Sequence, residues 1–83
     1  MQPPEGQGSF TVQVGAFRVR TPAEALRAKL AAAGYEAYLV ETESENGARY
    51  RVRIGAFATR QAAVEAAARL AAERPLSTYV TTR

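Results

Sequence analysis

The sequence repeats itself at a shift of 40 positions, and this internal repeat limits the folds that the chain can adopt. Residues 10–17 read FTVQVGAF and residues 50–57 read YRVRIGAF, so both segments share the pattern V-x-x-G-A-F. The match extends to Arg20/Arg60, Ala23/Ala63, Leu30/Leu70 and Val40/Val80. We therefore expect two similar halves, each built as a strand, a helix and a second strand.

Apolar and polar residues alternate at residues 10–14 and again at residues 50–54, which predicts one strand in each segment. A slip of one residue would turn both apolar sets to the wrong side, so the register of these strands is well specified. The apolar set is Val12, Val14, Val52 and Ile54, and the polar set is Thr11, Gln13, Arg51 and Arg53.

Start and stop signals predict one helix in each half. In the first helix, Thr21 is the expected N-cap, Glu24 completes a capping box, and Gly34 supplies the stop. The second helix is expected to start near Thr59 and to end before Pro75. The apolar faces are Leu26, Leu30 and Ala33 in the first helix, and Ala63, Ala66, Ala67 and Leu70 in the second.

The other two strands are expected at roughly residues 36–41 and 77–82, and Asn46-Gly47 indicates a hairpin turn after the first of them. The element order is therefore βαββαβ. Right-handed crossovers place both helices on one face and the two valine-rich strands in the centre. The predicted fold is α+β, a ferredoxin-like split βαβ sandwich with a four-stranded antiparallel sheet. We expect residues 9–83 to form this domain and residues 1–8 to form a linker.

The composition excludes several kinds of site. The chain has 83 residues, enough for one domain, and contains no cysteine and no histidine. Disulfides, thiol nucleophiles, histidine bases and Cys/His metal sites are thus excluded. Composition alone leaves a carboxylate-only metal site or a glycosidase-like acid pair open, but we expect no enzymatic activity, no metal and no cofactor. The net charge of +3 suits an anionic partner. No apolar run is long enough to span a bilayer, and no signal peptide is visible. We therefore expect any membrane anchor or signal to lie upstream.

The sheet face without helices should present polar side chains to solvent. Alternation places Thr11, Gln13, Arg51 and Arg53 there from the central strands, with Tyr38 from the second strand. The orientation of the fourth strand stays open, because either Ser77/Tyr79 or Thr78/Val80 can face outward. Amides, guanidinium groups and an aromatic ring on one rigid surface suit a carbohydrate ligand.

The paired V-x-x-G-A-F segments, at this spacing and with the intervening helix ending at Gly34-Tyr35, resemble the SPOR (sporulation-related repeat) family over roughly residues 9–82. The resemblance implies a βαββαβ fold that binds peptidoglycan glycan strands lacking stem peptides. It also implies that the glycan lies on the uncovered sheet face, that the domain sits in the cell envelope, and that its parent protein is targeted to the division septum.

The resemblance also suggests residue roles. Gln13 matches the glutamine of the family's first strand, and Arg51 matches the basic residue before the V-x-x-G of the third strand. Ala16 stands where many members have serine, so a hydroxyl contact is absent there. Arg49 stands where some members have tryptophan, which leaves any stacking on a sugar to Tyr38 or Tyr79. The expected glycan-binding residues are Gln13, Arg51, Arg53, Thr11, Ala16 and Tyr38.

Other functions share this fold, and three alternatives stay open. An RNA-binding module stacks bases on aromatic residues of the central strands, where this chain has Gln13, Arg51 and Arg53. A regulatory or dimerisation module binds at subunit interfaces, whereas we expect a monomer here. An acylphosphatase-like enzyme would use Arg18 to hold phosphate, but the loop lacks the flanking glycines. We expect neither nucleic acid nor membrane insertion.

Overall fold

The structure, a computed structural model, describes residues 8–83 and shows the element order βαββαβ. The sheet has four antiparallel strands in the order β2-β3-β1-β4, so β1 and β3 are central, as predicted. Residues 1–7 of the predicted linker lie outside the described residues. The elements are β1 (Phe10–Phe17), α1 (Arg20–Ala32), β2 (Ala37–Ser44), β3 (Gly47–Phe57), α2 (Arg60–Glu73) and β4 (Tyr79–Thr82).

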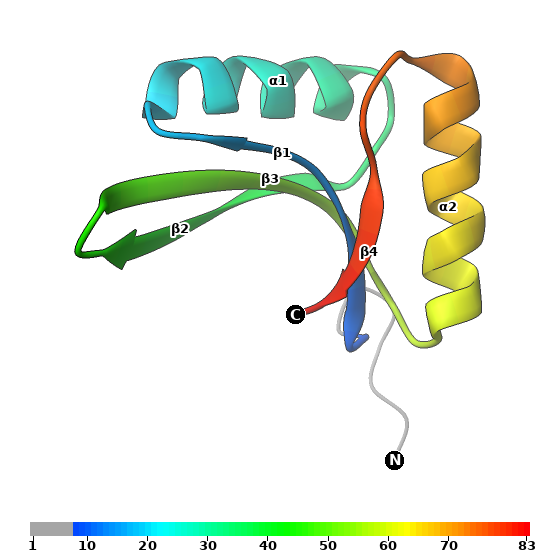
Figure 1. Ribbon diagram of the computed structural model, residues 1–83. Helices are drawn as coiled ribbons and strands as arrows, with labels where there is room; N and C mark the ends of the chain where they lie inside the picture. The colour runs from blue at the N-terminus through cyan, green and yellow to red at the C-terminus, as the bar shows by residue number, and fades with distance from the viewer. Residues whose placement is uncertain (1–7) are drawn as a thin grey trace.

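Both helices lie on the same side of a strongly bent sheet (Figure 1). Helix α1 packs mainly on β2 and β3, and α2 packs mainly on β1 and β4. The helices stand on the outer side of the bend, and the inner side carries no helix (Figure 1). We call this inner surface the helix-free face. The predicted ferredoxin-like fold is therefore confirmed.

The hydrophobic core follows the internal repeat. Eight of its nine fully buried members are four pairs related by the shift of 40 residues, and Ala67 has no such counterpart because residue 27 is an arginine. Leu30 and Leu70, one from each helix, are completely enclosed between helix and sheet. Each half thus contributes the same apolar groups to one shared core. The four pairs are Val12/Val52, Val14/Ile54, Ala23/Ala63 and Leu30/Leu70.

The repeated G-A-F segment has a packing reason in each central strand. The ring of Phe17 covers Gly15, and the ring of Phe57 covers Gly55. A Cβ atom would approach the ring to 2.9 Å at Gly15 and to 2.6 Å at Gly55. Glycine is therefore required for the phenylalanine two residues later to fold back over its own strand.

Two β-bulges interrupt the pairing of β1 with β3. One extra residue on β3 lies between the pairs Phe10↔Phe57 and Val12↔Ile54, where Gly55 has a φ of +72°. One extra residue on β1 lies between the pairs Gln13↔Arg53 and Gly15↔Val52. Bulges bend a strand and increase its twist, which accounts for the bent sheet of Figure 1.

Of the predictions for the helix ends and faces, the one at Thr59 is confirmed and three are wrong. Helix α2 starts directly after Thr59, as expected, and Thr59 caps it by accepting a hydrogen bond from the Ala62 N–H at 3.1 Å. Thr21 is not the N-cap of α1, because Val19 occupies that position without a side-chain cap bond. Glu24 makes no capping box, because its carboxylate accepts hydrogen bonds from Arg27 at 2.6 and 2.9 Å. The predicted apolar face of α1 is wrong at Ala33, which is exposed.

The hairpin between β2 and β3 is longer than predicted. The pairing continues to Ser44↔Gly47, and the turn consists of Glu45 and Asn46. Strand β2 therefore ends at Ser44 rather than near Glu41, because backbone pairing with β3 sustains its polar end. The hairpin extends beyond the helices (Figure 1).

We predict that Gly55→Ala destabilises the domain by about 2–3 kcal/mol, because it combines left-handed backbone strain with displacement of the Phe57 ring. Gly34→Ala is the matched control, because Gly34 has a φ of +99° and open space around its Cβ position. It should cost only about 1–2 kcal/mol. Urea unfolding measures both, and equal losses would show that the ring contact contributes nothing.

Candidate functional site

The strand register determines which side chains lie on the helix-free face. Directly opposite residues of antiparallel strands point to the same side of a sheet. Val52 and Ile54 point into the core, so Arg49, Arg51 and Arg53 point away from it. The side chains that the register places on this face are Tyr38, Val40, Thr42 and Ser44 from β2, Arg49, Arg51 and Arg53 from β3, Thr11, Gln13 and Ala16 from β1, and Tyr79 and Thr81 from β4.

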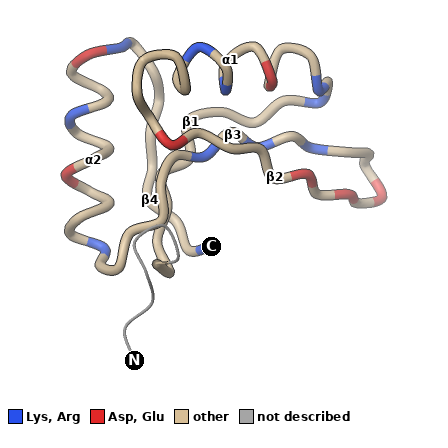
Figure 2. Tube along the Cα trace, turned by 180° about the vertical axis from the view of Figure 1, so that it is seen from behind, with Lys and Arg blue, Asp and Glu red and all other residues tan. Residues whose placement is uncertain are grey.

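This face is cationic. Its strand positions include three arginines and no acidic residue, although the whole chain has a net charge of only +3. The hairpin separates the signs, because Glu41 and Glu43 pair with Tyr50 and Ala48 and thus point to the opposite side. Figure 2 shows the acidic positions on β2 beside the basic positions on β3. Such segregation concentrates positive potential on one surface.

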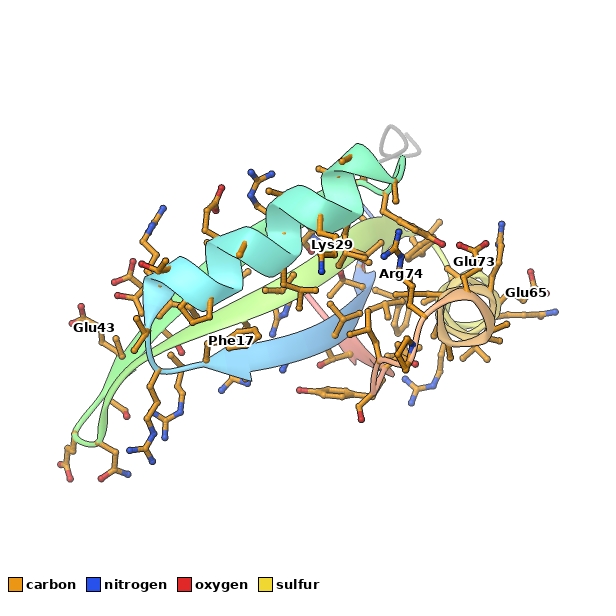
Figure 3. The ribbon with its side chains drawn as sticks, turned by 90° about the horizontal axis from the view of Figure 1, so that it is seen from above. Phe17, Lys29, Glu43, Glu65, Glu73 and Arg74 are labelled. Atoms are coloured by element: carbon orange, nitrogen blue, oxygen red, sulfur yellow. The ribbon has the colours of Figure 1, made fainter. Side chains whose placement is uncertain are left out.

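The remaining carboxylates lie elsewhere in the described residues. Glu43 lies on the hairpin and Glu65 and Glu73 lie on α2, away from the middle of the sheet (Figure 3). Glu41 lies 3.7 Å from Arg20 at the start of α1. Among residues 8–83, no ion pair joins the three arginines of β3 to a carboxylate. An anionic ligand can therefore pair with them.

One row of side chains crosses all four strands. It contains Tyr38, Arg53, Gln13 and Tyr79, which are successive register partners. Within this row, the Arg53 Nε donates a hydrogen bond to the Gln13 Oε1 at 3.2 Å. Gln13 is only 3% exposed, so its neighbours cover it. The sequence prediction that Gln13 is presented to solvent is wrong, and its amide is positioned to hold the Arg53 guanidinium.

Thr11 is completely buried, although it points to the helix-free face. Its Oγ1 lies 3.0 Å from the Ile54 oxygen and 2.8 Å from the Gly55 oxygen, and it accepts a hydrogen bond from the Tyr38 hydroxyl at 2.9 Å. These carbonyls lie at the bulge, where strand pairing is interrupted. Thr11 is among the predicted ligand contacts, whereas in the structure its side chain is buried and its hydroxyl satisfies the backbone.

Tyr38 lies over the bulge. Besides its bond to Thr11, its hydroxyl lies 3.3 Å from the Gly55 oxygen, and the Arg83 guanidinium carbon stands 6.0 Å from the ring centroid. Much of the Tyr38 side chain is therefore engaged within the domain.

The second bulge brings Ala16 to the helix-free face. Strict alternation from Val12 would turn Ala16 toward the core, but the extra residue on β1 reverses its side, and Ala16 pairs with Arg51. Ala16 is exposed, so a small residue adjoins this guanidinium. Sequence reasoning missed Arg49 as a site residue, although the alternation of β3 signals it.

The opposite side of the sheet holds the groups with shifted pKa values. A hydrogen bond to the Glu73 carboxylate raises the pKa of Tyr35, and the Arg27 guanidinium lowers the pKa of Glu24. A cavity of ≈ 490 Å³ also lies there, lined by Val12, Tyr35, Ile54, Phe57, Ala66 and Leu70 among others. Neither the cavity nor these pairs include Arg49, Arg51 or Arg53.

Within residues 8–83, no group of three or more acidic side chains is arranged to hold a metal ion. The same residues contain no helix with the length and apolar character needed to cross a membrane.

The model of the SPOR domain family matches residues 6–81. A solved structure with a TM-score of 0.71 and 29% sequence identity is the peptidoglycan binding domain of the B. subtilis cell wall lytic enzyme CwlC. The alignment covers 100% of this chain and 99% of that chain. Comparison with curated proteins finds no significant match.

We predict that Thr11→Val lowers the free energy of unfolding by about 1–3 kcal/mol, because it removes the buried hydroxyl that donates to the bulge carbonyls. Combining it with Tyr38→Phe should give less than the sum of the single losses, since the two hydroxyls share a hydrogen bond. Thr42→Val lies on the same face, and the Thr42 side chain makes no hydrogen bond within residues 8–83, so this control should change stability by less than about 0.5 kcal/mol. Additive losses in a urea double-mutant cycle would contradict the shared network.

Proposed function

Because this chain belongs to the SPOR domain family, we propose that it is a non-catalytic domain that binds peptidoglycan glycan strands on its helix-free face. The solved relative is a peptidoglycan binding domain, and the two chains cover each other almost completely. The observation that carries the proposal is the row of three arginines on β3, which stands on a face without acidic strand positions.

The preferred ligand in this proposal is a strand that lacks stem peptides. In glycan strands that carry stem peptides, the lactyl carboxyl group of muramic acid forms an amide bond to the peptide. Removal of the peptide leaves a free carboxylate at each muramic acid. A guanidinium group binds a carboxylate through two parallel, charge-assisted hydrogen bonds. The proposed contacts to these carboxylates are Arg51 and Arg53, with Arg49 in line on the same strand.

The arginines differ in what holds them. The Nε of Arg53 is bonded to Gln13, so this guanidinium is oriented before a ligand arrives. Arg51 stands beside the small side chain of Ala16, which leaves access to it. We assign Gln13 a positioning role, and direct contact with the ligand to Arg51 and Arg53. Thr11 and Tyr38 support the bulge beneath the ligand rather than bind it.

This mode of binding would localise the parent protein to the cell envelope. Amidases remove stem peptides at the division septum, so a domain that prefers denuded strands would concentrate there. The face is complete within one chain, and the proposed binding therefore requires no second copy.

We predict that Arg51→Ala weakens binding to amidase-treated sacculi by about tenfold or more, because it removes a charge-assisted contact. Arg60→Ala is the matched control, since it removes the same charge from the exposed start of α2. It should change affinity by less than about twofold. Co-sedimentation with sacculi, before and after amidase treatment, measures both variants.

Two outcomes of this experiment would contradict the proposal. Equal losses for the two variants would show that net charge, not the helix-free face, determines binding. Failure of the unsubstituted domain to bind either preparation would exclude wall binding, and single-stranded RNA would then be the next ligand to test. RNA binding would fall steeply as salt rises.

The positioning role of Gln13 generates a separate prediction. Gln13→Ala should weaken binding to amidase-treated sacculi when Arg53 is present, because Gln13 acts through that guanidinium. In a chain that already carries Arg53→Ala, it should have little further effect. A double-mutant cycle of affinities measures the coupling, which we expect to be about 1 kcal/mol. Independent, additive losses would instead show that Gln13 contacts the glycan itself.

A further inference from the structure

Three large hydrophobic side chains are strongly exposed within residues 8–83, and Tyr79 is the aromatic one among them. It is 52% exposed, and it pairs with Gln13 on the helix-free face. The other two exposed members of this group, Val19 and Val64, lie outside the strands. No hydrogen bond of the Tyr79 side chain is formed within the described residues. Its ring is therefore available to a ligand.

The second aromatic residue of the face is committed to the fold. The Tyr38 hydroxyl bonds to Thr11 and lies near the Gly55 oxygen, and its ring has the Arg83 guanidinium above it at 6.0 Å. A sugar could reach this ring only by displacing these contacts. Of the two tyrosines that the sequence offers for stacking, the structure leaves Tyr79 free and occupies Tyr38.

We propose that Tyr79 is the platform on which one pyranose ring of the glycan strand stacks, an inference that rests on the proposed function. A pyranose presents C–H groups on its apolar side, and a tyrosine ring offers a rigid apolar surface with a polar tip. Stacking does not depend on the charge of the sugar. In this proposal Tyr79 contacts the sugar ring, whereas the arginines bind the carboxylate.

The geometry joins these two contacts along one short oligosaccharide. Tyr79 and Arg53 stand in the same row, two strands apart, which corresponds to roughly 10 Å. Arg51 lies two residues further along β3, or about 7 Å beyond Arg53. A ring on Tyr79 can therefore lie within the same strand as a muramic acid whose carboxylate pairs with Arg51. The path runs obliquely across β1, where Ala16 offers no obstruction.

Binding measurements with Tyr79→Ala and Tyr79→Phe test this inference on two probes, amidase-treated sacculi and an uncharged chitin-type oligomer. We expect Tyr79→Ala to weaken binding to treated sacculi by about tenfold and to remove detectable binding of the oligomer. Tyr79→Phe keeps the ring and should stay within about twofold on both probes. Val64→Ala, which truncates an exposed apolar side chain on α2, is the control and should leave both unchanged.

The outcomes separate this inference from the proposed function. If the unsubstituted domain binds treated sacculi and Tyr79→Ala binds them equally well, the stacking role is overturned while wall binding stands. If Tyr79→Phe loses as much affinity as Tyr79→Ala, the hydroxyl rather than the ring makes the contact, which also overturns stacking. If the unsubstituted domain binds neither probe, the proposed function fails first. Urea unfolding of each variant verifies that a loss of affinity is not a loss of fold.

Discussion

The two bulges between β1 and β3 are the constraint on which the rest of the structure depends. Each inserts one residue into a central pair of strands, one at Gly55 and one between Gln13 and Gly15. Because side chains alternate along a strand, an extra residue changes the side of everything beyond it. The first bulge bends the sheet and is satisfied by Thr11, and the second turns Ala16 to the face of Arg51. Without them, the sheet would be flatter and the site would have other members.

Electrostatic segregation in the β2–β3 hairpin gives this face its chemistry. The hairpin is exposed on both sides beyond the helices, so neither side needs apolar residues (Figure 1). Glutamates point to one side and arginines to the other, which avoids neutralising the arginines within the strand pair. The acidic side reaches toward α1, where Glu41 meets Arg20 at 3.7 Å. The basic side remains open to an anionic ligand.

Most of the fold could be predicted from the sequence, because the core positions are dictated by local alternation that is written twice. The bulges could not, since they depend on pairing between segments about 40 residues apart. The burial of Thr11 and Gln13 escaped prediction for the same reason. Strand β4 shows the limit of the repeat itself. In the 40-residue repeat, Tyr79 is equivalent to Leu39, whose side chain points into the core. Tyr79 points outward instead, because it pairs with Gln13 on the helix-free face.

Equivalent positions of the two central strands differ in kind on one side of the sheet only. Inward positions of the two halves carry the same kind of residue, because both halves fill one core. Outward positions are free of that demand and differ, with Thr11 equivalent to Arg51 and Gln13 equivalent to Arg53. On β1, these residues serve the structure and the neighbouring strand, through the bulge and through the Arg53 Nε. On β3, the equivalents present charge. One central strand therefore supports what the other displays, and the site is asymmetric although the core is not.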